Sequence, residues 1–286
     1  RTPGNGQVLL RQFGAEARAV DPRLDDLLAP EQMSAPLRQL FVRAGDALDA
    51  VAAVDLRALK AVPLQPGTPI GATVGSVATV VGLGALQILV SPNLGRVAIP
   101  LATSPPTLLV GEPLARARNE GARMFIVVRA LKMILSHAAV MIRASEQDSA
   151  ALVGALFTAF NPSYVPQGLE PKRHMELVRR ITAALPRNID PTVGVVALEA
   201  AGFVGSSWTQ LSAAGAAWAN RAALLAVGDP NAALDGLAWV RSEDAAPTDP
   251  EARAAWIARN AEARDLMTFS VTDAYAEARM RLGLDK

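Results

Sequence analysis

Cysteine is absent from the 286-residue sequence, and histidine occurs only twice, at His137 and His174. A chain without cysteine forms no disulfide, has no thiol nucleophile and offers no thiolate to a metal ion. The absence fits a reducing compartment, and we expect a cytoplasmic protein. The sequence starts with Arg1 rather than Met, so we interpret it as one piece of a larger bacterial protein.

Aromatic residues and surplus charge are also scarce. Aromatic side chains make up 5% of the chain, and 28 basic residues against 27 acidic ones leave a net charge of +1. Binding to nucleic acid needs a concentrated basic face, so we expect no nucleic-acid partner. Hydrophobic residues reach 51%, with alanine prominent over residues 213–226. An alanine-rich interior favours closely packed helices, because alanine costs least in a helix.

The pattern along the chain predicts an α+β fold that is predominantly α-helical. Proline, glycine and aspartate recur over residues 1–33, which indicates a linker or a docked N-terminal arm. Residues 34–286 are predicted to form a single, mainly helical domain. Its first helix starts at Ser34, a good capping residue, with Pro36 in its first turn. A small antiparallel sheet of three or four strands is expected at residues 70–112, before a multi-helix C-terminal body.

Residues 70–91 are the most ambiguous stretch, because they contain no charge and are long enough to span a membrane. Threonine, serine and glycine dilute the run, and its valines favour strands interrupted by glycine turns. We therefore predict buried strands here, and membrane association through this stretch stays the weaker alternative. The next apolar runs, 96–101 and 107–110, are expected to continue the sheet as antiparallel hairpins, joined by proline-containing turns.

Apolar residues at helical spacing then predict helices up to the C-terminus. On the first of them, Arg129 and Lys132 are interpreted as the side that faces water. The predicted helices cover residues 124–135, 144–160, 172–185, 191–200, 207–227, 232–241, 251–267 and 272–282.

The motifs of common catalytic and metal sites are missing. His137 has no glutamate beside it and no second histidine four residues away, so the zinc-peptidase pattern HExxH is absent. His174 and Glu176 give the H-x-E half of a zinc-deaminase signature, but the cysteine half cannot exist in this chain. We therefore interpret His174 as a surface histidine at a helix start. No phosphate-binding loop or nucleophile elbow occurs either, and we predict no catalytic, metal-binding or cofactor-binding residue.

Adjacent carboxylates occur at Asp25 with Asp26 and at Glu243 with Asp244. Polar residues and prolines surround both pairs, which favours solvated loop charges over catalytic groups.

The sequence does offer a candidate interaction or ligand surface, centred on a long irregular segment at residues 161–173. Such loops often carry function. Tryptophans are usually core anchors, although an exposed one is a typical interaction hot spot. The candidate surface residues are Tyr164, Arg173, His174, Trp208 and Trp218.

Two resemblances add to this interpretation. Residues 221–239, with Gly228 and Asp229 at a turn, resemble one tetratricopeptide-type helical hairpin, and residues 264–270 are a further cue. The chain thus looks like a C-terminal region of large bacterial helical-repeat proteins. The order of sheet, apolar helix and helical tail over residues 85–284 also resembles a gluzincin-type metallopeptidase domain. In that family the helix after the sheet carries the zinc ligands. Here that helix has Arg129, Ala130, Leu131, Lys132 and Met133 at its middle, so the resemblance implies a catalytically dead domain.

These observations lead to one main hypothesis and one alternative. The main hypothesis is a noncatalytic structural or protein-interaction module, not an enzyme. Its partner would be another protein or another domain of the same parent chain. The alternative is an enzyme or a small-ligand-binding domain whose site lies near residues 161–173 and has no local motif.

Overall fold

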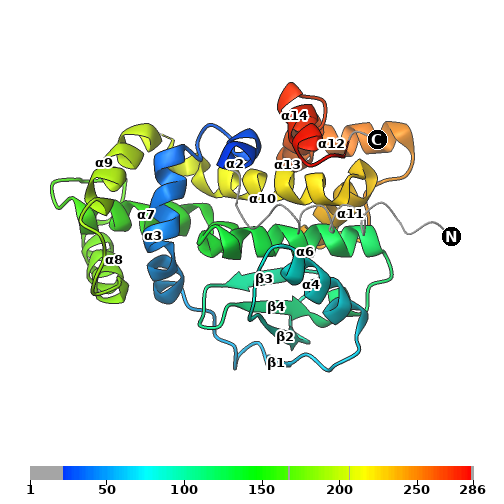
Figure 1. Ribbon diagram of the computed structural model, residues 1–286, viewed down its shortest axis with the longest axis horizontal. Coiled ribbons are helices and arrows are strands. Elements are labelled where there is room, and N and C mark those ends of the chain that lie inside the picture. Colours follow the sequence, from blue (N-terminus) through cyan, green and yellow to red (C-terminus); the bar gives the residue numbers. More distant parts are fainter. Residues whose placement is uncertain (1–21, 167, 206, 285–286) are drawn as a thin grey trace.

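The structure is a computed structural model that describes residues 22–166, 168–205 and 207–284 (Figure 1). The first 21 residues of the predicted N-terminal arm lie outside this part. The remainder of the arm forms helix α2 (Pro22–Leu28) and the turn that leads to α3 (Ala35–Val51). The predicted fold class is confirmed, since the described residues form thirteen α-helices and four short strands.

Helices dominate the rest of the chain. Those that follow α3 are α4 (Pro69–Val80), α5 (Glu112–Ala115), α6 (Glu120–Leu135), α7 (Glu146–Phe160), α8 (Pro171–Ala184), α9 (Val193–Val204), α10 (Leu211–Val227), α11 (Pro230–Val240), α12 (Pro250–Arg259), α13 (Ala261–Phe269) and α14 (Asp273–Arg281), with short 3-10 turns at Ala139–Ile142 and Trp208–Gln210.

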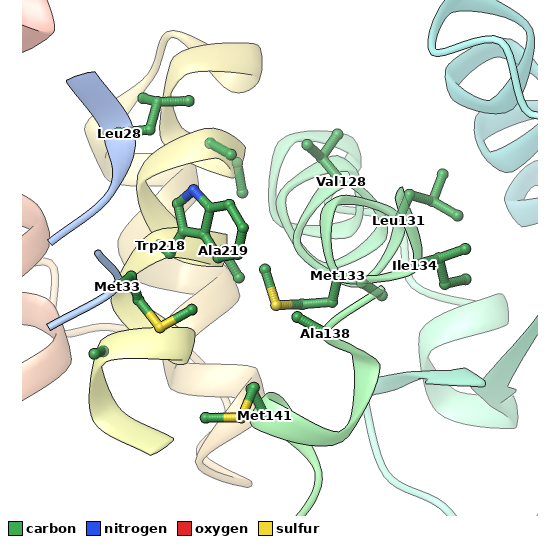
Figure 2. Close-up of a cluster of buried hydrophobic side chains, with 14 of the residues drawn as sticks. Leu28, Met33, Val128, Leu131, Met133, Ile134, Ala138, Met141, Trp218 and Ala219 are labelled. Atoms are coloured by element: carbon green, nitrogen blue, oxygen red, sulfur yellow. The ribbon is translucent and has the colours of Figure 1, made fainter. Parts of the chain in front are cut away.

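Helix α6 lies at the centre of the molecule. Figure 1 shows it between the sheet on one side and α10 on the other, and α4 and α11 also pack against it. In Figure 2, Met133 of α6 faces Trp218 of α10, whereas Leu131 and Ile134 point away from that tryptophan. Because α6 is covered on several sides, twelve of its sixteen residues are buried.

The sheet contains β1 (Val62–Pro63), β2 (Gln87–Ser91), β3 (Ala98–Leu101) and β4 (Thr107–Gly111), in the order β1-β2-β4-β3. The prediction of a purely antiparallel sheet is wrong at its centre, because β2 and β4 run parallel, with Leu89 opposite Leu109. The hairpin expected between the run that ends at residue 91 and the run 96–101 is also wrong, because β2 and β3 are not neighbours in the sheet. The hairpin expected between 96–101 and 107–110 is confirmed, since β3 and β4 pair antiparallel. Strand β4 is buried at all five positions, and such a strand takes an inner place in a sheet.

The strands predicted at residues 70–80 are contradicted by helix α4. The Thr68 side chain accepts a hydrogen bond from the Gly71 backbone N–H, and Pro69 occupies the first turn. This is a strong helix start. Ile70, Val74 and Val77 then recur at helical spacing and are buried. Valine-rich composition was the misleading signal, because one buried helix face accepts β-branched residues.

Most of the predicted C-terminal helices are present, with one correction. The helix expected at residues 251–267 is divided into α12 and α13 at Asn260. The Asn260 Oδ1 atom accepts hydrogen bonds from the backbone N–H groups of Glu262 and Ala263, which starts a new helix there. The predicted hairpin of α10 and α11 is observed, with Gly228 in the left-handed region at φ 68° and Asp229 capping α11.

Helix α6 buries two cationic side chains that sequence patterning had assigned to its wet side. Arg129 is only 7% exposed. Its Nε donates to Asn220 Oδ1 at 2.7 Å, and Asn220 Nδ2 donates to Glu262 Oε2 at 2.8 Å. Burial lowers the pKa of Arg129, while the charge of Glu262 raises it. A carboxylate on α13 thus compensates a guanidinium on α6 through an asparagine on α10.

Lys132 is the second of these cations, with 16% of its side chain exposed, and its partner is Asp25 of α2. The Lys132 Nζ atom lies 2.5 Å from Asp25 Oδ1, and the same carboxylate accepts a hydrogen bond from Trp218 Nε1 at 3.0 Å. Burial lowers the pKa of Lys132, and Asp25 opposes that shift. The interpretation of Asp25 as a solvated loop charge is therefore wrong. Its carboxylate ties α2 to α6 and α10.

A close backbone approach joins α3 to the end of α6. A Cβ atom placed on Gly45 would lie 1.9 Å from the carbonyl oxygen of His137. His137 itself adopts φ 51°, and its Nδ1 lies 2.9 Å from Asp46 Oδ1. Only glycine therefore fits at position 45 without a shift of the two segments.

We predict that Gly45→Ala lowers the free energy of unfolding by about 1–3 kcal/mol, because the added methyl group displaces the His137 carbonyl. Urea unfolding followed by circular dichroism measures it. Gly75→Ala is the control, because a Cβ at Gly75 meets no atom within 4 Å. In an exposed helix this change should raise stability by about 0.5–1 kcal/mol. Equal effects of the two substitutions would contradict the close approach.

Candidate functional site

Three of the predicted surface residues lie together beside the end of α7. The ring of Tyr164 is 5.6 Å from that of Phe157 and 5.8 Å from that of Trp208, and Phe157 and Trp208 are 5.9 Å apart. The two contacts of Phe157 are edge-to-face, an arrangement that is stabilising. Partial burial raises the pKa of Tyr164 to about 12. The predicted loop is thus fastened to the helical body by an aromatic cluster.

His174 lies inside this region, so its interpretation as a surface histidine is wrong. It is 8% exposed, and its Nε2 is 3.0 Å from Thr158 Oγ1. The carbonyl oxygens of Gly154 and Tyr164 lie 3.1 and 3.0 Å from the Thr158 hydroxyl, which donates its single hydrogen to one of them. With the threonine hydrogen directed to a carbonyl, His174 Nε2 carries the proton and donates to Thr158.

The Nδ1 atom of His174 is buried and has no hydrogen-bond partner. A proton there would create a charged N–H without an acceptor, so burial lowers the pKa of His174. The sequence did contain a signal for this position. His174, Leu177, Val178 and Ile181 follow helical spacing along α8, and all are buried or half-buried.

The other two predicted residues are placed elsewhere. Arg173 points toward α7 and forms an ion pair with Asp148, with both side chains about half exposed. Trp218 is 1% exposed and lies in the core between α2 and α6, where Lys132 Nζ is 4.2 Å from its ring centre (Figure 2). The candidate surface therefore does not exist as predicted, because Trp218 is a core anchor.

A cavity of about 410 Å³ lies between the end of α3, the start of α7 and α8. Arginines 143, 173 and 180 contribute to its wall. Arg143 pairs with Asp49 at 2.6 Å, and Arg180 donates to the carbonyl oxygen of Val51 at 2.6 Å. Since Arg173 is paired with Asp148, all three cations already have partners. The cavity lining also includes the carboxylates of Asp148 and Glu176, so its wall presents charges of both signs.

Within residues 22–166, 168–205 and 207–284, no group of three or more histidine, aspartate or glutamate side chains is arranged to hold a metal ion.

Helix α9 shows the most unusual surface. Its inner face is built from three alanines and two valines, all of them buried, namely Val193, Ala197, Ala200, Ala201 and Val204. Its outer face carries the two largest apolar side chains of the helix, Leu198 57% and Phe203 69% exposed, together with Val195 60% exposed. Gly202 and Glu199 are exposed between them. We call the five exposed residues, Val195, Leu198, Glu199, Gly202 and Phe203, the α9 face.

The α9 face is contiguous, since its members occupy adjacent directions on a helix with about 100° per residue. A helix that is apolar all round is normally covered on every side. Here the larger apolar side chains are the uncovered ones. Figure 1 places α9 with α8 at one end of the molecule, and α3 and α7 pack against it.

Among the described residues, none of the helices has both the length and the apolar character required to cross a membrane. Helix α9 has 12 residues and a length of about 18 Å, against about 30 Å for the hydrocarbon core of a bilayer.

Comparisons of the chain with protein-family profiles, with curated proteins and with solved structures gave no match. The resemblances to helical-repeat proteins and to gluzincins therefore stay predictions.

The two histidines are predicted to titrate in opposite directions. Hydrogen bonding to Asp46 raises the pKa of His137, whereas burial lowers the pKa of His174. Histidine NMR signals recorded against pH should give one pKa above 6.5 and one below it. The stabilisation from neutral His174 is present above pH 6.5 and is lost as the pH falls through its folded-state pKa. That from His137 is present below pH 6.5 and is lost as the pH rises through its folded-state pKa.

The variants His137→Gln and His174→Gln assign the two NMR signals, because each variant should remove one of the two titrations. A single common pKa near 6.5 would contradict both environments.

Proposed function

We propose that this chain is a noncatalytic protein-interaction module, and that the α9 face is the surface with which it binds another protein. The observation that carries the proposal is the reversed arrangement of α9. The helix buries three alanines and two valines, whereas its largest apolar side chains, Leu198 and Phe203, are exposed together with Val195. Contiguous exposed apolar patches on soluble proteins mark interaction sites.

The surroundings of α9 support a docking role. The hydroxyl of Thr192, at the start of the helix, accepts a hydrogen bond from Arg43 Nη1 of α3 at 2.9 Å. The inner face of α9 is fully packed, and α3 and α7 support it. The exposed side chains therefore project from a fixed helix, so less conformational entropy is lost when a partner covers them.

The test uses site-specific photo-crosslinking in cells that express the natural full-length protein. A photoreactive phenylalanine analogue replaces Leu198 on the α9 face. In the control it replaces Met280 of α14, which is 62% exposed and also helical. We predict a discrete crosslinked protein from position 198 and none from position 280. The absence of a product at position 198, or the same product at both positions, would sink the proposal.

A second candidate function, binding of a small ligand, is favoured by the cavity beside Arg173. It is tested by a thermal-shift screen of small carboxylates and phosphates. A ligand whose stabilising effect disappears in Arg173→Ala but persists in Arg187→Ala would favour this candidate. Arg187 is exposed and lies outside the residues that line the cavity.

A further inference from the structure

Glu199 is the charged member of the α9 face and lies at the middle of the helix, which runs from residue 193 to 204. Its carboxylate is exposed, and in the part of the chain that the structure describes it forms no ion pair. Apolar residues surround it along the helix. A partner that covers this face must therefore accommodate a negative charge at the centre of the contact.

A second copy of the chain is a poor match for that charge. Two-fold contacts bring the same patch of both subunits together. A symmetric antiparallel pairing that covers the whole α9 face puts its axis near the helix centre, so the two Glu199 carboxylates approach each other. Like charges in an interface are destabilising.

Arg43 does not relieve this repulsion. Its guanidinium is held at Thr192, seven residues before Glu199 and about 10 Å away along the helix axis. In the symmetric pairing, the second copy's arginine lies beyond the far end of α9. Shifting the pairing toward Arg43 leaves Phe203 uncovered. Self-association therefore either relieves the repulsion between the Glu199 carboxylates or covers all the apolar side chains of the α9 face, and it does not do both.

The size of the face fits one helix. From Val195 to Phe203 it is about 12 Å long, and it is about one helix diameter, 10 Å, across. This is far less than the roughly 800 Å² that each partner contributes to a stable interface between globular bodies. Gly202 leaves open space at its surface, since a Cβ there would meet no atom within 4 Å. That space, between Leu198 and Phe203, accepts a large side chain from a helix lying alongside.

We infer that the partner element is an amphipathic helix of a different protein, with a lysine or arginine among apolar residues on its contact face, opposite Glu199. The inference rests on the proposed function, because it takes the α9 face as the docking surface. An apolar contact supplies affinity, and the opposed charges select the partner and its register. Membrane surfaces fit less well, because α9 carries no basic residue to meet anionic lipid.

The test uses the purified protein and two synthetic helical peptides of 15 residues. Both have four leucines on one face and differ only at the centre of that face, which is lysine in one and glutamate in the other. Fluorescence anisotropy should show about fivefold or more tighter binding of the lysine peptide. Glu199→Lys should reverse this preference, and Glu199→Gln should abolish it. Leu198→Gln should weaken both peptides at least tenfold, whereas the control Met280→Gln should change neither.

The outcomes separate the inference from the proposed function. If Leu198→Gln leaves the affinity for the lysine peptide unchanged, or if that peptide does not bind up to its solubility limit, the α9 face is not a helix-docking surface and both fail. If the wild-type protein binds both peptides equally, and Leu198→Gln weakens the binding of both, only the charge selection is overturned.

Sedimentation and vesicle binding test the competing occupants. A dimer of the wild-type protein that dissociates in Leu198→Gln would make a second copy the occupant. Binding of the wild-type protein to phosphatidylcholine vesicles that is lost in Leu198→Gln would make a membrane surface the occupant of the α9 face. Either result overturns the inferred partner.

Discussion

The fold depends on burying α6, a helix that carries three cationic side chains into the core. Arg123 and Arg129 are each 7% exposed, and Lys132 is 16% exposed at its side chain. A buried charge costs several kcal/mol unless it is hydrogen-bonded and paired. Each cation is compensated by a different part of the chain. Thr73 of α4 and the carbonyl oxygen of Ala117 accept from Arg123, Asn220 of α10 accepts from Arg129, and Asp25 of α2 pairs with Lys132. The core therefore specifies which elements surround α6.

Helix α9, at one end of the molecule, differs from α6 in which side chains it exposes. Around α6, polar groups are matched internally and apolar side chains are covered. At α9 the large apolar side chains face outward, and the exposed Glu199 lies among them. In the docking that we propose, this face gains its stabilisation from a partner helix rather than from the chain itself. The alanine-rich composition serves both ends, because small inner residues let α10 approach α6 and let α9 lie close to α3 and α7.

Much of the helical architecture could be predicted from caps and periodicity. Ser34 and Pro36 mark the start of α3, and Gly228 with Asp229 marks the α10–α11 turn. Local sequence signals did not predict features that depend on contacts between segments far apart in the sequence. The parallel pairing of β2 with β4 depends on the placement of β3, which no turn sequence encodes. Asp25 and Arg129 were assigned to water because their compensating partners are 107 and 91 residues away in the sequence. The α9 face was missed because an apolar helix gives no indication of which side its neighbours leave uncovered.

The absence of cysteine allows the most direct test of the central claim that another protein covers the α9 face. Leu198→Cys introduces a thiol on that face, and Met280→Cys introduces one on α14; each is the single thiol within the 286-residue sequence. A maleimide reagent should modify both variants at similar rates in the purified protein. In cells that express the full-length chain, the thiol at position 198 should be protected while that at position 280 stays reactive. Equal reactivity of the two thiols in cells would contradict the account.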